Sequence, residues 1–295
     1  MAVNARLAVP WACVKVVMAP AGRSGRRTIC GMATDGHLSE LLAAAEEEFA
    51  EASFRTGDFA RVRELLAEAL AGAEQVGDLA GRARALDLLG MVAHYDNITE
   101  VMSGRRVPAE EIDAEERLFR QALAAWHAAG QGPATAQALF GLGLVYQVLH
   151  SDWASAMPYF WQALELADVN DADVGLYLRS EVHRHVGFYF LVADAQPAEA
   201  VRHLQLSLDL REQLGDPRRI PSGQVALAQA ELASGHRDRA IELLRAAVLQ
   251  AREAGLLAQR IEDAERALRE AEAAAPDTGT ETWDATGRSD TNAAG

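Results

Sequence analysis

Histidine is the residue type in this sequence best suited to chemistry at neutral pH, because imidazole can both exchange a proton and ligate a metal ion. The chain has eight histidines. His183 and His185 are two positions apart, so on a helix they point to different sides and cannot hold one ion together. No histidine lies four residues from another, and the pattern His-Glu-x-x-His is absent. We therefore predict no metal site.

Other catalytic signatures are also missing from the sequence. It contains no phosphate-binding or dinucleotide-binding glycine pattern and no pattern of a nucleophilic triad. Gly141 and Gly143 fall inside an apolar helical run, so we expect them to allow close helix packing. Paired carboxylates such as Glu115-Glu116 are what the solvated face of an acidic helix produces. The sequence predicts no catalytic constellation and no cofactor.

The balance of charge argues against nucleic acid as a partner. The formal net charge is −15, and an acidic chain repels phosphate backbones. Only Lys15 among the 28 basic residues is a lysine, which suggests a GC-rich bacterial genome. Both cysteines, Cys13 and Cys30, precede residue 37, so the rest of the chain has no disulfide framework. We expect a cytoplasmic protein.

The two ends differ in composition from the middle of the chain. Residues 1–36 include an apolar stretch, 7–18, that Lys15 interrupts and that is too short to span a bilayer. We expect a disordered leader or a start assigned too early, with the true start at Met32; a secretory signal is the alternative. Residues 276–295 have the composition of a disordered tail. We predict no membrane association.

Residues 37–275 alternate apolar helical runs with short breaks, and no run alternates as a strand would. In one run, apolar residues recur at the spacing of a single helix face: Val62, Leu65, Leu66, Ala69, Leu70 and Ala73. Each break supplies Gly, Pro or a capping side chain, and the breaks fall at 56–58, 77–78, 130–133, 151–152, 170–171, 196–197, 215–217 and 235. The chain is predicted to be all-α, with its helices in pairs.

The helix pairs repeat along the chain. In each second helix a bulky residue is followed three positions later by a small one: Leu66 and Ala69, Phe119 and Ala122, Phe160 and Ala163, Leu204 and Ser207, Leu244 and Ala247. Each first helix has a small residue before the turn: Ala50, Gly90, Gly143, Gly187 and Ala228. Small residues let antiparallel helices approach, and bulky residues fill the space beside them. This repetition is typical of a solenoid.

Four segments share a motif: Thr56-Gly57-Asp58-Phe59 with Ala69-Leu70; Leu142-Gly143 with Tyr146, Ala156, Phe160, Ala163 and Leu164; Val186-Gly187 with Phe190 and Ala200; and Leu227-Ala228 with Ala240, Leu244 and Ala247. These segments resemble the tetratricopeptide repeat (TPR) family and are similar to the helical repeat domains of bacterial transcription regulators. Glu231 departs from the family pattern, which usually has an aromatic residue there. The resemblance implies a right-handed α-solenoid of about five repeats, with residues 256–274 as a capping helix.

The resemblance also implies that ligands bind in a concave groove lined by the first helices. The faces of those helices turned away from the core combine large apolar side chains with arginines, as hot spots for protein partners do. Arg84 and Arg184 could together hold a carboxylate such as a C-terminus. The alternative is an ordinary half-exposed surface. The candidate partner-binding residues are Arg84, Asp87, Met91, His94, Tyr95, Phe140, Gln147, Glu181, Arg184 and Phe188.

An insertion interrupts the second repeat at residues 97–113, with Gly104-Arg105-Arg106-Val107-Pro108 at its centre. It is either a plain surface loop or a lid that folds over the groove. His94 and Tyr95 precede it directly, so a lid would cover them.

These observations leave three hypotheses about function. The first is a non-catalytic scaffold that binds a protein or peptide segment in its groove, as a regulatory or assembly factor. The second is a small-molecule-binding protein or enzyme with a pocket around His94 and Tyr95 under the insertion. The third is a homodimer that pairs through exposed aromatic residues.

Overall fold

The computed structural model describes residues 35–167 and 172–273 of the chain. The predicted leader, 1–36, lies outside these residues except for Asp35 and Gly36, which begin the first helix. The predicted tail, 276–295, and the predicted break at 170–171 also lie outside them.

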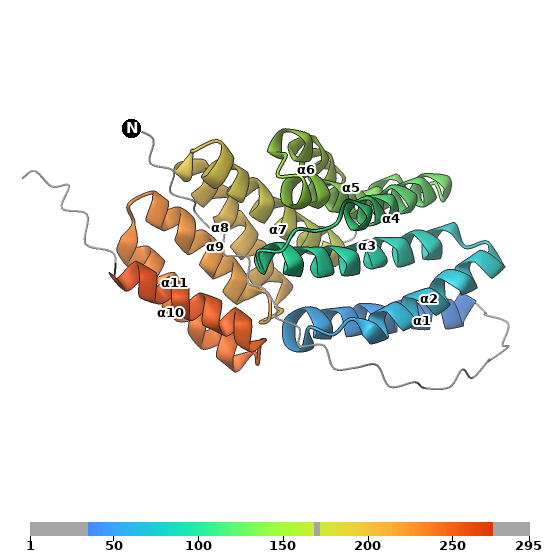
Figure 1. Ribbon diagram of the computed structural model, residues 1–295, viewed down its shortest axis with the longest axis horizontal. Coiled ribbons are helices and arrows are strands. Elements are labelled where there is room, and N and C mark those ends of the chain that lie inside the picture. The colour runs from blue at the N-terminus through green and yellow to red at the C-terminus, as the bar shows by residue number, and fades with distance from the viewer. Residues whose placement is uncertain (1–34, 168–171, 274–295) are drawn as a thin grey trace, which may run out of the picture.

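Eleven α-helices and no strand make up the described part of the chain (Figure 1). They form five successive hairpins, in which α1 packs on α2, α3 on α4, α5 on α6, α7 on α8 and α9 on α10, and α11 caps the last hairpin. None of the helices in residues 35–167 and 172–273 is long and apolar enough to cross a membrane. The predicted all-α solenoid of five repeats with a capping helix is confirmed.

The bounds of the helices follow the predicted breaks. They are α1 (Asp35–Glu51), α2 (Ala60–Val76), α3 (Leu79–Met102), α4 (Ala109–Ala128), α5 (Thr135–Leu144), α6 (Trp153–Ala167), α7 (Ala172–Phe188), α8 (Pro197–Leu214), α9 (Ile220–Ala233), α10 (Arg237–Glu253) and α11 (Ala258–Ala273). π-Helical turns extend α1, α5 and α7: η1 (Ala52–Thr56), η3 (Val145–Leu149) and η4 (Tyr189–Ala193); the 3-10 turn η2 (Gly132–Ala134) precedes α5.

Local turn chemistry ends and starts these helices where the sequence predicted. Gly77 ends α2 with φ of 73°, a left-handed conformation that glycine adopts without steric cost. Asp78 then begins α3, because its side chain accepts a hydrogen bond of 2.9 Å from the main-chain N–H of Gly81. One Gly-Asp pair therefore closes one helix and opens the next.

The predicted contacts between bulky and small residues are present. The ring of Phe119 is fully buried against Gly141, where an added Cβ would lie 2.2 Å from its Cε1 atom. Phe160 packs in the same way against Gly143, where the corresponding distance is 2.4 Å. These glycines serve close helix packing, as predicted.

The prediction of an insertion over residues 97–113 is wrong in extent. Helix α3 continues to Met102 and α4 begins at Ala109, so only residues 103–108 form a turn. The polar residues at 94–97 do not end α3, because His94 and Asn97 turn their side chains to Glu115 of α4. The residues predicted as an insertion mainly lengthen the hairpin of α3 and α4. None of residues 103–108 borders the cavity described below.

The first and last repeats of the solenoid meet (Figure 1). The side chain of Arg260 donates to the carbonyl oxygen of Ser53 at 2.7 Å, and Arg55 donates to that of Ala254 at 3.4 Å. Phe54 of η1 is buried beside Ala251 of α10 and nearby Leu256. The array therefore closes on itself instead of leaving an open groove between its ends.

Candidate functional site

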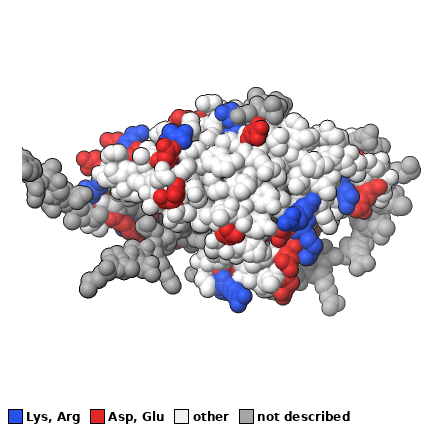
Figure 2. All heavy atoms as spheres, turned by 90° about the horizontal axis from the view of Figure 1, so that it is seen from above, with Lys and Arg blue, Asp and Glu red and all other residues white. Residues whose placement is uncertain are grey.

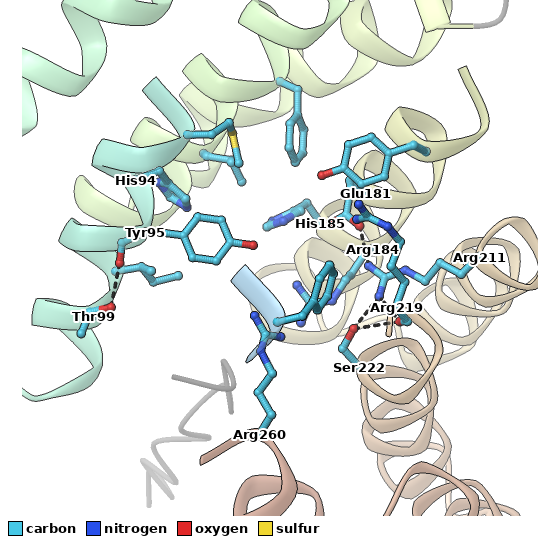
Figure 3. Close-up of a pocket in the computed structure, with 16 residues that line it drawn as sticks. His94, Tyr95, Thr99, Glu181, Arg184, His185, Arg211, Arg219, Ser222 and Arg260 are labelled. Carbon is cyan, nitrogen blue, oxygen red and sulfur yellow. Dashed lines mark hydrogen bonds and ion pairs between the residues drawn. The ribbon is translucent and has the colours of Figure 1, made fainter. Parts of the chain in front are cut away.

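The curved array surrounds a partly open cavity of about 120 Å³ (Figure 3). Its walls come from η1, α3, α5, α7, α8, α9, α11 and the turn before α9. The lining residues are Phe54, Met91, His94, Tyr95, Ile98, Thr99, Phe140, Leu144, Tyr177, Glu181, Arg184, His185, Arg211, Arg219, Ser222 and Arg260. The first helices of the three central hairpins (α3, α5 and α7) thus line one cavity together with the capping helix α11.

Arginine side chains distinguish this cavity from the outer surface. On the face shown in Figure 2, acidic and basic side chains lie mostly beside one another, so their charges offset locally. The cavity is instead bordered by Arg184, Arg211, Arg219 and Arg260, with Glu181 as the one acidic side chain among its described lining residues. Figure 3 shows Arg184, Arg211 and Arg219 across the space from His94 and Tyr95, with Arg260 reaching up from α11 between the two sides. The cavity is therefore basic within an acidic protein.

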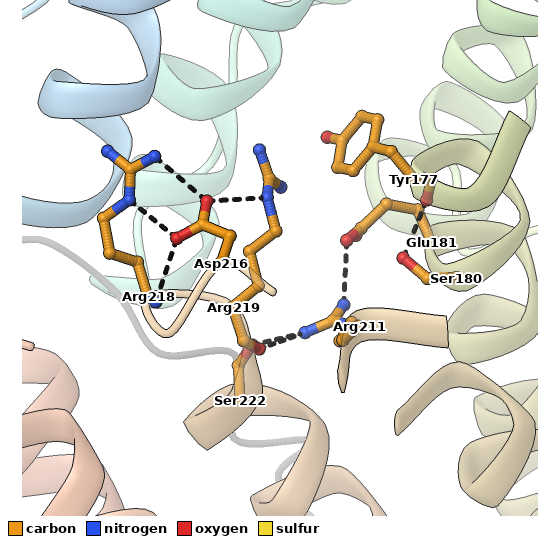
Figure 4. Close-up of polar contacts among 8 residues, drawn as sticks. All are labelled: Tyr177, Ser180, Glu181, Arg211, Asp216, Arg218, Arg219 and Ser222. Atoms are coloured by element: carbon orange, nitrogen blue, oxygen red, sulfur yellow. Dashed lines mark hydrogen bonds and ion pairs between the residues drawn. The ribbon is translucent and has the colours of Figure 1, made fainter. Parts of the chain in front are cut away.

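Arg211 is held by several hydrogen bonds (Figure 4). Its side chain is 3% exposed, and its guanidinium donates to Glu181 Oε1 at 2.8 Å. It also donates to Ser222 Oγ at 2.6 Å and to the carbonyl oxygen of Arg219 at 2.9 Å. These bonds fix the start of α9 against α7 and α8, and Glu181 neutralises Arg211.

Phe54 is surrounded by cations from the last two repeats. The guanidinium carbons of Arg218, Arg219 and Arg260 lie 5.3, 5.1 and 5.3 Å from the centre of its ring, within the range of cation–π attraction. Arg218 and Arg219 share the carboxylate of Asp216 (Figure 4). The aromatic ring thus helps to hold several positive charges close together.

Burial is the main cause of the pKa shifts of two lining groups, Arg184 and Tyr177. Burial first, and the charge of Arg211 second, lower the pKa of Arg184 to about 10, while Glu181 acts in the opposite direction. Burial, together with Glu181, raises the pKa of Tyr177 to about 12, so its phenol stays protonated. Near neutral pH the arginines stay charged, and they can donate hydrogen bonds to an anion.

His94 is oriented by a buried carboxylate. Glu115 of α4 is fully buried; one of its oxygens lies 2.8 Å from His94 Nδ1, and the other accepts from the side-chain amide of Asn97 at 2.8 Å. The prediction that the pair Glu115-Glu116 is merely solvated is therefore wrong for Glu115. Glu116 is half-buried, and its carboxylate pairs with Arg120 and accepts a hydrogen bond from the phenol of Tyr146.

His185 contributes a neutral ring to the cavity. Its Nδ1 lies 2.7 Å from Oε1 of Gln147, and its ring contacts that of Phe140. Burial first, and the charge of Arg184 second, lower its pKa well below the ordinary value for histidine. His185 therefore stays uncharged at neutral pH.

Another histidine pair lies away from the cavity. The Nδ1 atoms of His183 and His203 are 2.9 Å apart, a distance that requires one of the two nitrogens to carry the shared proton. Burial, with Arg202, lowers the pKa of His203 to about 4. Within residues 35–167 and 172–273 no three His, Cys, Asp or Glu side chains are grouped to hold a metal ion.

Six of the ten predicted site residues border the cavity: Met91, His94, Tyr95, Phe140, Glu181 and Arg184. Phe188 lies instead in a second, smaller cavity of about 30 Å³, which shares Arg184, Ser222 and Arg260 with the first.

The other three predicted residues point elsewhere. Arg84 pairs with Glu46 at the surface, so it does not join Arg184 in holding a carboxylate, contrary to our prediction. Asp87 is buried and accepts a hydrogen bond from Trp126. Gln147 is buried and holds His185 in place.

The aromatic residues expected on an exposed surface are buried. Phe54, Phe140 and Phe188 are 7, 2 and 1% exposed, and Met91 is 8% exposed. The prediction that these four side chains are exposed is therefore wrong, whereas the homodimer stays a prediction. These side chains fill the inside of the closed array.

Sequence reasoning missed the residues that give the cavity its charge. Arg211 lies on a second helix, Arg219 in a turn and Arg260 on the capping helix, whereas only first helices were expected to line the groove. The adjacent basic pair Arg218-Arg219 at the start of the fifth repeat was the one local signal available.

The successive hairpins and the contacts between bulky and small residues define an α-helical repeat fold. The chain is similar to the solved structure of TPR-like repeats described as those of a kinesin light chain from Podosopora anserina, with 17% identity and a TM-score of 0.43 over 74% of this chain and 94% of that one. A single-substitution variant of those repeats gives 16% identity and a TM-score of 0.45 over 72% and 93% of the two chains. No protein-family model matches the chain, and a comparison with curated proteins gives no match.

Proposed function

We propose that this chain is a non-catalytic binding protein that holds a small anionic ligand in the cavity enclosed by its helical hairpins. Helical repeat proteins commonly present concave surfaces to protein partners. The observation that carries the proposal is the convergence of four arginine side chains, against one carboxylate among the described lining residues, on a partly open cavity beside the contact between η1 and α11.

Support for binding over catalysis comes from the kind of groups that face the space. Guanidinium groups keep their protons at neutral pH, so they hold an anion and do not exchange protons with it. His185, which could exchange a proton, is neutral and engaged with Gln147. His94 is held by Glu115.

A thermal-shift panel of small carboxylates, phosphates and sulfates tests the proposal. We expect at least one anion to raise the melting temperature of the wild type, because a ligand that binds only the folded state stabilises it. The shift should be largely lost in Arg184→Gln, since one charge-assisted contact accounts for roughly a tenfold change in affinity.

The matched control is Arg84→Gln, which removes an arginine that lies on α3 and outside the cavity. It should keep the full shift. If no anion stabilises the wild type more than Arg184→Gln, the proposal is wrong.

A second candidate is a partner protein that inserts an acidic side chain or its terminus into the same cavity. The TPR-like fold favours it, because this fold commonly mediates protein–protein interaction. A peptide library displayed to the wild type and to Arg184→Gln distinguishes the two candidates. Enrichment of acidic peptides by the wild type only, with no stabilising small anion, would favour the partner.

A further inference from the structure

We infer that the ligand of this cavity is a short dicarboxylate, with one carboxylate at the arginines and the other at the ring nitrogen Nε2 of His94. The inference rests on the proposed function and names the chemical class of the ligand. Three features carry it: the engagement of the other ring nitrogen of His94, the position of its ring across the cavity from arginines, and the size of the space between them.

His94 offers one ring nitrogen to a ligand. Its Nδ1 atom is occupied by Glu115 at 2.8 Å. Its Nε2 atom makes no hydrogen bond within residues 35–167 and 172–273, although His94 is only 5% exposed and borders the cavity. A polar atom that has little water around it and no partner is costly, so a ligand that bonds to Nε2 is stabilised there.

The buried carboxylate decides what Nε2 offers. Glu115 is fully buried, and its second oxygen accepts from the side-chain amide of Asn97 at 2.8 Å. Because an unbalanced charge is costly at such a position, we expect Glu115 and His94 together to carry no net charge. In both neutral arrangements, imidazolium beside carboxylate and imidazole beside carboxylic acid, Nε2 carries a proton. His94 is therefore a hydrogen-bond donor to the ligand.

The neighbouring phenol is compatible with this polarity. Figure 3 shows the hydroxyl of Tyr95 directed into the same space, on the side of His94. A hydroxyl both donates and accepts, so Tyr95 adapts to the ligand, whereas the N–H of His94 requires an acceptor. The ligand must therefore present an oxygen acceptor to α3.

The opposite side of the cavity requires an anion. Within the described part of the chain, Arg260 contacts a main-chain carbonyl oxygen and an aromatic ring, neither of which is charged. Arg219 shares Asp216 with Arg218, so these three residues together carry one net positive charge. A planar carboxylate suits guanidinium groups, which donate paired N–H bonds.

The two sides face each other across a small space. Figure 3 shows Arg219 across the cavity from His94, so donors border the cavity on both sides. The cavity measures about 120 Å³. An engineered cavity of roughly 150 Å³ holds benzene. A chain of a few carbon atoms with a carboxylate at each end therefore fits, whereas a nucleotide or a long acyl chain does not.

Calorimetry with matched acids tests the inference. Succinate carries both carboxylates, butyrate lacks the second one, and 4-aminobutyrate replaces it with an ammonium group that can only donate. We expect succinate to bind at least roughly tenfold more tightly than either of the others. Equal affinity of succinate and butyrate would overturn the inference. So would an advantage of 4-aminobutyrate over butyrate as large as that of succinate.

Three variants test whether the second carboxylate lies at His94. His94→Asn keeps an amide that can donate to Glu115 but removes Nε2, so it should abolish most of the advantage of succinate over butyrate. Arg219→Gln should weaken both acids roughly tenfold and keep that advantage. The matched control is His127→Asn, at an exposed histidine of α4 outside the cavity lining, and it should change neither affinity. Persistence of the full advantage in His94→Asn would overturn the inference.

A measurement on the wild type does not depend on the folding of His94→Asn. In protein with ¹⁵N-labelled histidine, succinate should shift the resonance of His94 Nε2, because its second carboxylate accepts the proton of that nitrogen. Butyrate at saturation should shift it far less. A resonance that succinate leaves unchanged, or that both acids shift equally, would overturn the inference.

The remaining arm distinguishes a free acid from the end of a partner chain. An acetylated tetrapeptide ending in aspartate carries two carboxylates at a similar separation. Binding of this peptide no tighter than that of succinate supports a free acid, whereas tighter binding overturns it in favour of a chain terminus. If monocarboxylates or phosphates stabilise the wild type and depend on Arg184, but succinate has no advantage, the proposed function stands and this inference falls. If no anion binds, both fall.

Discussion

The main-chain N–H of Leu257 donates a hydrogen bond of 2.9 Å to the carbonyl oxygen of Phe54, joining the start of the capping region to the first repeat. Arg260 and Arg55 add side-chain bonds across the same junction. Phe54 and Arg260 of this junction border the cavity, whereas the turn at 103–108 does not. The contact between the ends is thus what converts a groove into a pocket.

Removing the aromatic ring at this junction should open it. In Phe54→Ala the three guanidinium groups around the ring lose their shared partner, and Leu256 loses an apolar contact. We expect amide hydrogen exchange at Leu257 to become at least roughly tenfold faster, because its acceptor lies on the residue that loses its anchor.

The control is Phe59→Ala, which removes a buried ring of the first hairpin core that packs against the rings of Phe49 and Tyr95. Phe59→Ala should lower overall stability without selectively accelerating amide hydrogen exchange at Leu257. If both variants accelerate the exchange at Leu257 equally, the junction has no stability of its own.

The close approach of Phe119 and Gly141 gives a prediction about packing. An added Cβ would meet ring atoms at 2.2 to 2.5 Å, so Gly141→Ala should lower the free energy of unfolding by roughly 1–3 kcal/mol despite the better helix propensity of alanine. Gly132→Ala, which meets nothing within 4 Å, should be neutral or slightly stabilising. Urea unfolding of both variants measures the difference, and equal stability would contradict it.

The buried carboxylate of Glu115 should be needed for stability. Glu115→Ala leaves the side chains of His94 and Asn97 without their acceptor, so we expect a loss of roughly 3 kcal/mol in the free energy of unfolding. Glu116→Ala, at the next position but paired with an exposed arginine, should cost below about 1 kcal/mol. A loss at Glu116 as large as that at Glu115 would refute this account of the pair.

Asp87 should make stability depend on pH. Burial raises its pKa to about 8, although the hydrogen bond from Trp126 opposes the shift, while in the unfolded chain the carboxyl titrates near 3.8. Between these values the folded protein keeps a proton that the unfolded chain releases. The free energy of unfolding should therefore fall as pH rises through this window, by at most about 1.4 kcal/mol per pH unit.

The variant Asp87→Asn cannot titrate, so its stability should depend less on pH and should gain on the wild type as pH rises from about 5 to 8. Denaturant unfolding at several pH values measures this. Asp96→Asn, a change at an exposed carboxylate of the same helix, is the control and should leave the slope unchanged. If the free energies of unfolding of the wild type and of Asp87→Asn change with pH in parallel, Asp87 is ionised in the folded protein.

Much of the local structure could be read from residue order. Turn residues such as Gly57 and Gly77 act on their immediate neighbours, and the 3.6-residue apolar period selects a helix wherever it occurs. The pairing of Phe119 with small residues followed from the repeat itself. These features depend on residues close together in the chain or one repeat apart, so the sequence alone determined the helices, the hairpins and the solenoid.

The cavity required the tertiary structure, because its charged side is assembled from residues that no local pattern connects. Arg211, Arg219 and Arg260 converge only because small rotations between successive hairpins add up until η1 meets α11. The contact between the ends buries Phe54 beside Ala251 and Leu256, whereas Phe140 and Phe188 are buried among side chains of neighbouring hairpins. The apolar period of the sequence shows which face of a helix packs on its neighbours. Only the packing angles of all the hairpins together decide which side chains meet around the cavity.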